Sequence, residues 1–252
     1  MPETRAPRLC VLIDADNVPS GYAEAIFEEI AGLGEASVRR IYGDWSAVRL
    51  AGWARKVNAL GMVADQQFAN TKGKNASDIG LVIAAMDFLH SGLFDAFVLV
   101  SSDSDFTRLA ARIREQGLDV YGMGEKKTPE AFRNACKRFI YVENLGAETA
   151  PAAARPEPEA APQPNDPTPD APAATGPQPP TKAIPLIVAA MKRIGSEEEW
   201  YSLGQLGQFI TQANPDFDSR TYGYAKLSDL LERTGRFEVK RERNHLMVRD
   251  KA

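Results

Sequence analysis

The amino-acid sequence predicts an α/β domain with a parallel central sheet, followed by a small C-terminal domain of the winged helix-turn-helix type. Short apolar runs at 9–13 and 96–100 are typical of buried parallel strands. Such runs alternate with segments of helical periodicity through short connections, which favours a parallel sheet flanked by helices. A proline-rich stretch then separates this alternating part from a C-terminal part with a different pattern.

The proline-rich stretch divides the chain into two domains. Residues 146–180 contain no aromatic residue and are dominated by Ala, Pro, Glu, Gln and Thr. Such a segment cannot bury a core, and we expect an extended, mobile tether. The predicted boundaries are therefore 1–145 for the N-terminal domain, 146–180 for the linker and 181–252 for the C-terminal domain. The linker also carries most of the net charge of −4, so the overall acidity says little about partners.

The elements of the N-terminal domain follow from their periodicity. The strand at 9–13 leads to a helix at 20–32, where Ala25, Ile26, Ile30 and Leu33 follow helical spacing. The remaining predicted elements are a strand at 37–42, a helix at 47–60, a strand at 62–65, a helix at 76–90, a strand at 96–101, a helix at 104–116, a strand at 118–122, a short helix at 128–135 and an extended segment at 138–142.

Spacing also predicts which face of the helix at 76–90 is apolar. That face carries Ile79, Val82, Ile83, Met86 and Leu89.

The C-terminal part shows three helical segments and then a hairpin. The helices are predicted at 183–193, 202–213 and 223–234. Two short strands at 237–240 and 245–249 follow, with a turn near 243–244. Three helices and a hairpin indicate a winged helix-turn-helix.

Aspartates stand where the predicted sheet would place a site. Asp14 directly follows the first strand, Asp103 and Asp105 follow the strand at 96–100, and Asp78 lies in the first turn of a helix. Carboxyl ends of parallel strands are where open α/β folds build their sites. Several carboxylates in one small volume need raised pKa values or a cation, and a hard divalent cation such as Mg²⁺ or Mn²⁺ suits oxygen ligands.

Each of these residues also has a purely structural interpretation. Asp14, Asn17 and Asp105 could be turn or cap residues, as could Ser102 beside Asp103. Asp78 could simply complement the helix dipole. Lys72 and Lys74, just before that helix, could contact a phosphodiester backbone or belong to a solvated loop.

Composition excludes several classes. No apolar run reaches the length of a membrane span, and the first residues lack the apolar core of a signal peptide, so we expect no membrane partner. The two cysteines, Cys10 and Cys136, form neither a metal-ligand pair nor a disulfide framework, which fits a reducing cytoplasm. The two histidines fall in separate domains, which disfavours a catalytic triad.

The N-terminal motifs resemble the NYN domain of the PIN-like nucleases over about residues 8–145. The resemblance rests on Ile13-Asp14-Ala15-Asp16-Asn17, on Ser77-Asp78-Ile79, on Ser101-Ser102-Asp103-Ser104-Asp105-Phe106 and on Gly122-Met123-Gly124. The family's third motif usually has glycine where this chain has Ser102. The resemblance implies a PIN-like three-layer sandwich and metal-dependent RNA cleavage. It implies Asp14, Asp78 and Asp103 as metal ligands, with Asp105 and Asn17 as supporting residues. We also count Asp105 with the three ligands among the candidate catalytic residues, and Ser101 and Ser102 among the supporting ones.

The C-terminal part resembles an OST-HTH, or LOTUS, domain over about residues 181–250. The motifs are Trp200-Tyr201-Ser202-Leu203-Gly204-Gln205-Leu206-Gly207, then Pro215-Asp216-Phe217-Asp218, then Tyr222-Gly223-Tyr224-Ala225-Lys226-Leu227. The family implies RNA binding or docking of a protein partner. Candidates for stacking and phosphate contacts are Arg220, Tyr222, Tyr224, Lys226, Lys240, Arg241 and Arg243.

Three functional hypotheses remain at this stage. The first is a metal-dependent ribonuclease with a C-terminal RNA-binding module. The second is a non-catalytic RNA-binding adaptor on the same fold. The third, less favoured, is a phosphatase, because Asp14-Ala15-Asp16 after a strand superficially matches an Asp-x-Asp nucleophile loop. The sequence leaves the oligomeric state open.

Overall fold

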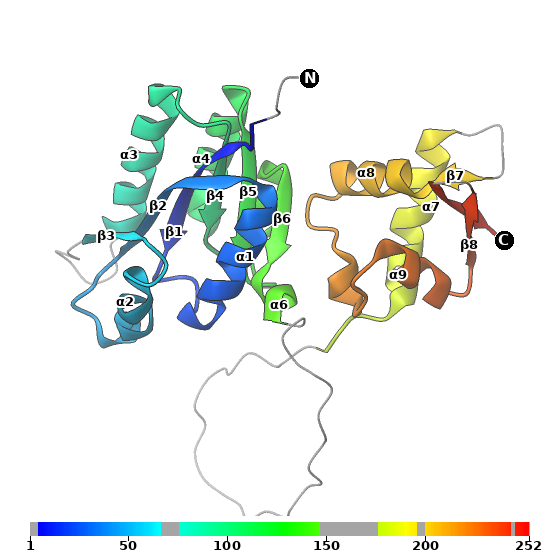
Figure 1. The fold of residues 1–252 in the computed structure, drawn as a ribbon, viewed down its shortest axis with the longest axis horizontal. Helices are drawn as coiled ribbons and strands as arrows, with labels where there is room; N and C mark the ends of the chain where they lie inside the picture. Colours follow the sequence, from blue (N-terminus) through cyan, green and yellow to red (C-terminus); the bar gives the residue numbers. More distant parts are fainter. Residues whose placement is uncertain (1–4, 67–75, 147–175, 196–199, 243–244, 252) are drawn as a thin grey trace, which may run out of the picture.

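A computed structural model describes residues 5–66, 76–146, 176–195, 200–242 and 245–251. Its N-terminal part is a six-stranded parallel sheet with the order β3-β2-β1-β4-β5-β6, which confirms the predicted α/β class (Figure 1). The strands are β1 (Arg8–Asp14), β2 (Glu35–Gly43), β3 (Val63–Gln66), β4 (Ala96–Val100), β5 (Asp119–Gly124) and β6 (Arg138–Tyr141).

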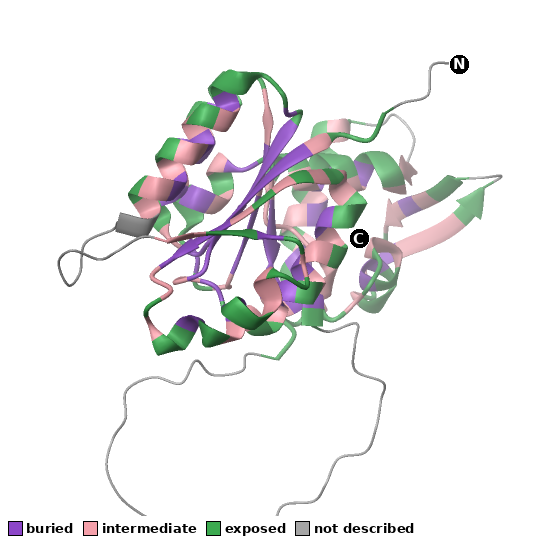
Figure 2. Ribbon diagram, turned by 60° about the vertical axis from the view of Figure 1, so that its left-hand side comes forward, coloured by how far each residue is buried: buried purple, intermediate pink, exposed green. Residues whose placement is uncertain are grey.

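Helices cover both faces of this sheet and create two apolar layers. In β1, Leu9, Val11 and Ile13 point into one layer, whereas Cys10 and Leu12 point into the other. The first layer is closed by α1 (Ala23–Leu33), α2 (Ala51–Val57) and α6 (Val142–Leu145). The second is closed by α3 (Ala76–Ser91), α4 (Thr107–Glu115) and α5 (Glu130–Ala135). Figure 2 shows the strands buried between helices whose outer faces are exposed.

The C-terminal part has its own apolar core. It contains α7 (Ile184–Ile194), α8 (Leu203–Ala213) and α9 (Leu227–Arg233), with a three-stranded sheet of β7 (Tyr201–Ser202), β9 (His245–Asp250) and β8 (Phe237–Glu242). Ile187, Leu206, Ile210 and Leu230 are fully buried in this core. The antiparallel pair β8–β9 is the predicted wing, and its turn at 243–244 lies outside the described residues.

The predicted apolar face of α3 is only partly confirmed as a core face. Leu89 is buried, and Val82 and Met86 pack partly buried against the core, but Ile79 and Ile83 are 61% and 58% exposed. The other buried residues of the helix are Leu81 and Ala85. Nearly every position of this helix is apolar or small, so several faces satisfy the same spacing. Packing against the sheet selects the face whose small Ala85 allows a close approach.

Two other predicted helices are shorter in the structure. The segment at 47–60 contains a 3-10 turn at Val48–Leu50 followed by α2. The segment at 223–234 contains α9 only from Leu227, because Gly223 ends a 3-10 turn (Ser219–Tyr222) in the left-handed region at φ 85°. The described helices include no segment with the length and apolar character required to cross a bilayer.

Candidate metal centre

The strand order places β1 and β4 side by side at the centre of the sheet. Ile13 pairs with Val100, so the residues that follow the two strands emerge next to each other. From β1 the chain continues to β2 and β3 on one side, and from β4 it continues to β5 and β6 on the other. Such a change of direction opens a crevice at the carboxyl ends of the strands, where open α/β sheets bind their ligands.

Asp14 closes β1 and is almost completely buried at this crevice. Its carboxylate accepts hydrogen bonds from the Ser101 hydroxyl at 2.7 Å, the Asn17 side-chain amide at 2.7 Å and the Asp16 backbone N–H at 3.1 Å. Burial raises the pKa of Asp14 above its ordinary value, although these hydrogen bonds act in the opposite direction. The predicted supporting residues Asn17 and Ser101 therefore both contact Asp14.

Ser101 connects the first aspartate motif with the third. Its hydroxyl donates to Asp14 and accepts a hydrogen bond from the Asp103 backbone N–H at 3.0 Å. Ser102 acts on the other side, where its hydroxyl accepts from the backbone N–H of Glu125 at 2.9 Å. The two serines thus attach the turn that carries Asp103 to two neighbours. These are Asp14 at the end of β1 and Glu125 after β5.

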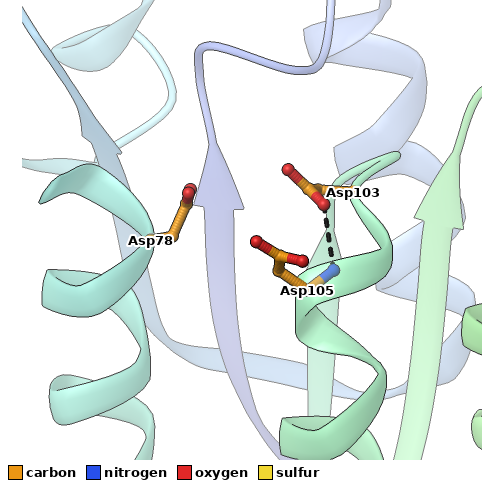
Figure 3. A group of neighbouring side chains, drawn as sticks. All are labelled: Asp78, Asp103 and Asp105. Carbon is orange, nitrogen blue, oxygen red and sulfur yellow. Dashed lines mark hydrogen bonds between the residues drawn. The ribbon is translucent and has the colours of Figure 1, made fainter. Parts of the chain in front are cut away.

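Asp78, Asp103 and Asp105 bring their carboxylates together. One oxygen from each lies within 4.8 Å of the others. Figure 3 shows Asp78 on α3 facing Asp103 and Asp105, which come from the turn after β4. Asp103 also caps this turn, since its Oδ1 accepts from the Asp105 backbone N–H at 2.9 Å. Asp103 is thus the residue whose side chain caps this turn.

The electrostatics of the group centre on Asp78. Partial burial, followed by the negative charges of Asp14, Asp103 and Asp105, raises the pKa of Asp78 to about 6. A bound cation would relieve the repulsion between these four carboxylates.

The donor set fits a hard divalent cation. All the donors are carboxylate oxygens, which Mg²⁺ and Mn²⁺ prefer, and no thiol or imidazole is among them. Of the three predicted ligands, the structure brings together Asp78 and Asp103. Asp105 completes the group of three, while the Asp14 carboxylate is committed to three hydrogen bonds behind it. Lys72 and Lys74 lie outside the described residues.

A pocket beside the first aspartate motif contains cations that sequence reasoning missed. It has a volume of about 260 Å³ and is lined by Asp16, Asn17, Arg49, Trp53 and Lys127, among others. Arg49 forms an ion pair with Asp16 at 2.8 Å, and Lys127 pairs with Glu125. Neither cation stands in a recognisable motif. Only the folded chain brings Arg49 beside the first aspartate motif.

The structure separates the predicted RNA-contacting residues of the C-terminal domain into two groups. Lys226 and Arg241 are exposed, and Lys240 lies with its ammonium 4.0 Å from the centre of the Trp200 ring. Arg220 instead is partly buried and pairs both with Asp218 and with Glu29 of the N-terminal domain. Tyr222 packs against Phe217, Tyr224 packs against the C-terminal core, and Arg243 lies outside the described residues.

Two family models match the chain. The NYN domain matches residues 8–143, and the OST-HTH/LOTUS domain matches residues 177–248. No curated protein gives a significant match.

Two solved structures that match the chain carry no assigned function in their descriptions. A crystal structure of a protein of unknown function from Vibrio parahaemolyticus is 18% identical with a TM-score of 0.48, and the match covers 57% of this chain and 98% of that chain. A solution structure of an uncharacterised protein from Nitrosomonas europaea is 33% identical with a TM-score of 0.26, covering 36% of this chain and 92% of that chain.

Proposed function

The chain belongs to the NYN domain family, and from this premise we propose that it is a metal-dependent ribonuclease whose C-terminal domain binds RNA. The observation that supports this most directly is the group formed by Asp78, Asp103 and Asp105 at the carboxyl end of the sheet. These side chains come from two distant segments, and their repulsion costs stability unless the site binds a cation.

In this proposal Asp78, Asp103 and Asp105 hold Mg²⁺ or Mn²⁺. When bound, the cation would make water more acidic and stabilise the negative charge that develops on the phosphate oxygens. Asp14 adds a fourth negative charge, and its hydrogen bond from Ser101 holds the turn that presents Asp103. Whether Asp14 also contacts the cation stays a prediction.

The rest of the chain supplies affinity for RNA. Lys226, Lys240 and Arg241 offer positive charge on the C-terminal domain, and Lys127 and Arg49 offer it beside the first aspartate motif. Cations of this kind contact phosphates without reading sequence. The OST-HTH/LOTUS match supports the assignment of RNA, and not another polyanion, as the ligand.

The test is a cleavage assay on labelled single-stranded and structured RNAs, with Mg²⁺ or Mn²⁺ and with EDTA. We expect metal-dependent cleavage that Asp103→Asn reduces by at least about 100-fold, since the substitution removes a charge from the site. Asparagine retains an oxygen that can cap the turn after β4, so folding should be unaffected. Asp87→Asn, which removes an exposed carboxylate from α3, is the matched control.

Undiminished cleavage by Asp103→Asn would contradict the site. RNA binding without cleavage in any metal would favour the non-catalytic adaptor. The burial of Asp14 argues against the phosphatase, because a carboxylate nucleophile must reach its substrate and this one is 1% exposed.

A further inference from the structure

We infer that the outer edge of the N-terminal sheet is a specific docking surface for the chain's own C-terminal domain, and that the two domains stay docked in solution. This surface, the β6 edge, consists of Glu29, Arg133, Arg138, Phe139, Tyr141 and Asn144. Its occupant is the segment 215–221 of the C-terminal domain. The inference is independent of the proposed function.

The contact begins at the backbone of an edge strand. β6 is the last strand of the sheet, so within the described part of the chain one side of it has no strand neighbour. The Phe139 N–H donates to the Pro215 carbonyl at 2.8 Å. Because unpaired N–H groups of an edge strand invite association with other chains, covering this edge also protects it.

Two ion pairs of opposite sense set the orientation. Glu29 of the N-terminal domain pairs with Arg220 at 2.9 Å, and Asp216 pairs with Arg133 of the N-terminal domain. Each domain thus contributes one carboxylate and one guanidinium. If the domains docked with the two pairs exchanged, Glu29 would face Asp216 and Arg133 would face Arg220. Like charges would then meet, so the charges favour the observed orientation over the exchanged one.

Both carboxylates have a second partner in the N-terminal domain. Arg138 also pairs with Glu29, and the Tyr141 hydroxyl donates to Asp216 at 2.7 Å. Burial tends to lower the pKa of Arg220, but its hydrogen bonds to Asp218 and Glu29 outweigh burial and raise the pKa. Arg220 therefore remains charged although its side chain is only 13% exposed.

An uncharged pair lies buried between the two domains. The Asn144 side-chain amide donates to the Thr221 hydroxyl at 2.9 Å, and these residues are 3% and 7% exposed. A buried amide or hydroxyl without a partner costs about 1–3 kcal/mol. Here each satisfies the other across the domain boundary, which indicates a matched interface.

The interface is polar, and a cavity of about 430 Å³ lies beside it, lined by Arg133, Tyr141, Asp216 and Tyr222 among others. Polar, imperfectly packed contacts between domains are usually weak. The covalent connection compensates, since joining two modules in one chain makes their contact intramolecular, with an effective concentration of up to about the mM range. A dissociation constant on the order of 0.1 mM would already leave the docked form dominant.

Docking has a consequence for RNA. Arg220 is engaged at the interface and Tyr222 lines the cavity beside it. Of the residues predicted to contact RNA, those that lie outside this region in the docked form are Lys226 and, on the wing, Lys240 and Arg241. Figure 1 shows the wing strands on the side of this domain that faces away from the N-terminal sheet.

The test measures the distance between spin labels in the full chain. Leu93→Cys and Glu232→Cys place one label on each domain at exposed positions. The native thiols Cys10 and Cys136 are buried, and burial raises the pKa of each to about 12, so they should not react. We expect one narrow distance distribution for the otherwise unaltered chain.

Charge reversal should abolish the narrow peak. Glu29→Arg faces Arg220 and Arg138 with a third cation, whereas Glu28→Arg makes the same change on the exposed face of α1 and should preserve the peak. The double variant Tyr141→Phe and Thr221→Val removes hydrogen bonds without a change in charge and should also broaden the distribution. Thermal melts would verify that each variant folds.

Three outcomes would overturn the inference. A broad distribution in the unaltered chain would mean that the domains move independently. A narrow peak that persists in both the Glu29→Arg and the Tyr141→Phe/Thr221→Val variants would mean that docking uses another surface. A narrow peak that disappears when labelled chain is diluted with excess unlabelled chain would mean that the occupant comes from a second copy.

Discussion

At the scale of single residues, the site uses one residue type in two environments. Asp14 is buried and surrounded by donors, whereas Asp78 is half-buried and surrounded by other carboxylates. The donors around Asp14 hold its carboxylate in a fixed position. The carboxylates around Asp78 repel it, and a bound cation would relieve this repulsion. Repulsion of this kind should be visible in the stability of the metal-free protein.

The pKa of Asp78 predicts how that stability depends on pH. The folded-state value of about 6 lies above the ordinary 3.8, so the folded protein binds this proton more tightly than the unfolded chain does. The resulting stability is fully present below about pH 4 and is lost as the pH rises through 6.

Asp78→Asn should therefore stabilise the protein in EDTA at pH 8 and leave it unchanged at pH 4. The expected gain in the free energy of unfolding is about 1 kcal/mol, allowing for solvent screening of a partly exposed group. Urea unfolding between pH 4 and 8 measures it. Asp87→Asn should follow the unaltered protein throughout. If the free energy of unfolding of Asp78→Asn depended on pH as that of the parent does, repulsion at Asp78 would be ruled out as the cause.

At the scale of elements, the approach of β5 to the turn after β4 positions the aspartates. The Ser101 N–H donates to the Met123 carbonyl at 2.9 Å. A Cβ at the next residue, Gly124, would lie 2.4 Å from the Ser101 carbonyl oxygen and 2.9 Å from the Thr128 hydroxyl. Only glycine lets the two backbones come this close.

Gly124→Ala should therefore push the Ser101 turn away from β5. We expect a loss of about 1–3 kcal/mol in the free energy of unfolding and a fall in cleavage rate, because Ser101 holds both Asp14 and Asp103. Denaturant unfolding and the RNA cleavage assay measure the two effects.

Gly32→Ala in α1 is the matched control, since its Cβ would enter open space. It should be neutral or stabilising by up to about 1 kcal/mol. A Gly124→Ala variant that is as stable as Gly32→Ala would show that the backbone adjusts freely there.

At the scale of the whole molecule, the arrangement of the domains decides which cations can reach RNA. Lys226 and Arg241 are exposed in the docked form, whereas Arg220 is occupied by carboxylates from both domains. Affinity for single-stranded RNA should therefore depend on the first two.

Replacing Lys226 and Arg241 together by Ala should weaken RNA binding and its dependence on salt. Removing a cation that neutralises one phosphate of a single strand lowers the slope of log K against log salt by about 0.7, so the pair should lower it by about 1.4. Binding titrations over a range of salt concentrations measure this. The control removes the same charge from the exposed end of α7, with Lys192→Ala and Arg193→Ala. Equal slopes for both double variants would place the RNA elsewhere.

Much of the fold and part of the candidate site could be predicted from local pattern. Buried parallel strands are continuous apolar runs, which is why 9–13 and 96–100 were recognisable, and a carboxylate after such a strand must emerge at the sheet edge. The face of α3 could not be predicted, because an almost uniformly apolar helix has no unique periodicity. The neighbours of Asp14 could be predicted as motifs, but their hydrogen bonds could not.

The chain's local chemistry determined the alternating elements, the aspartate motifs and the division at the proline-rich stretch, because each depends on residues close together in sequence. Folding in three dimensions decided which carboxylates meet, with Asp105 joining Asp78 and Asp103 while Asp14 is held behind them. It also placed Arg220 at the contact between the domains, where it pairs with Glu29, 191 residues away in sequence. The spacing of residues along the chain cannot predict such a contact, because it is the packing of whole domains that brings the two residues together.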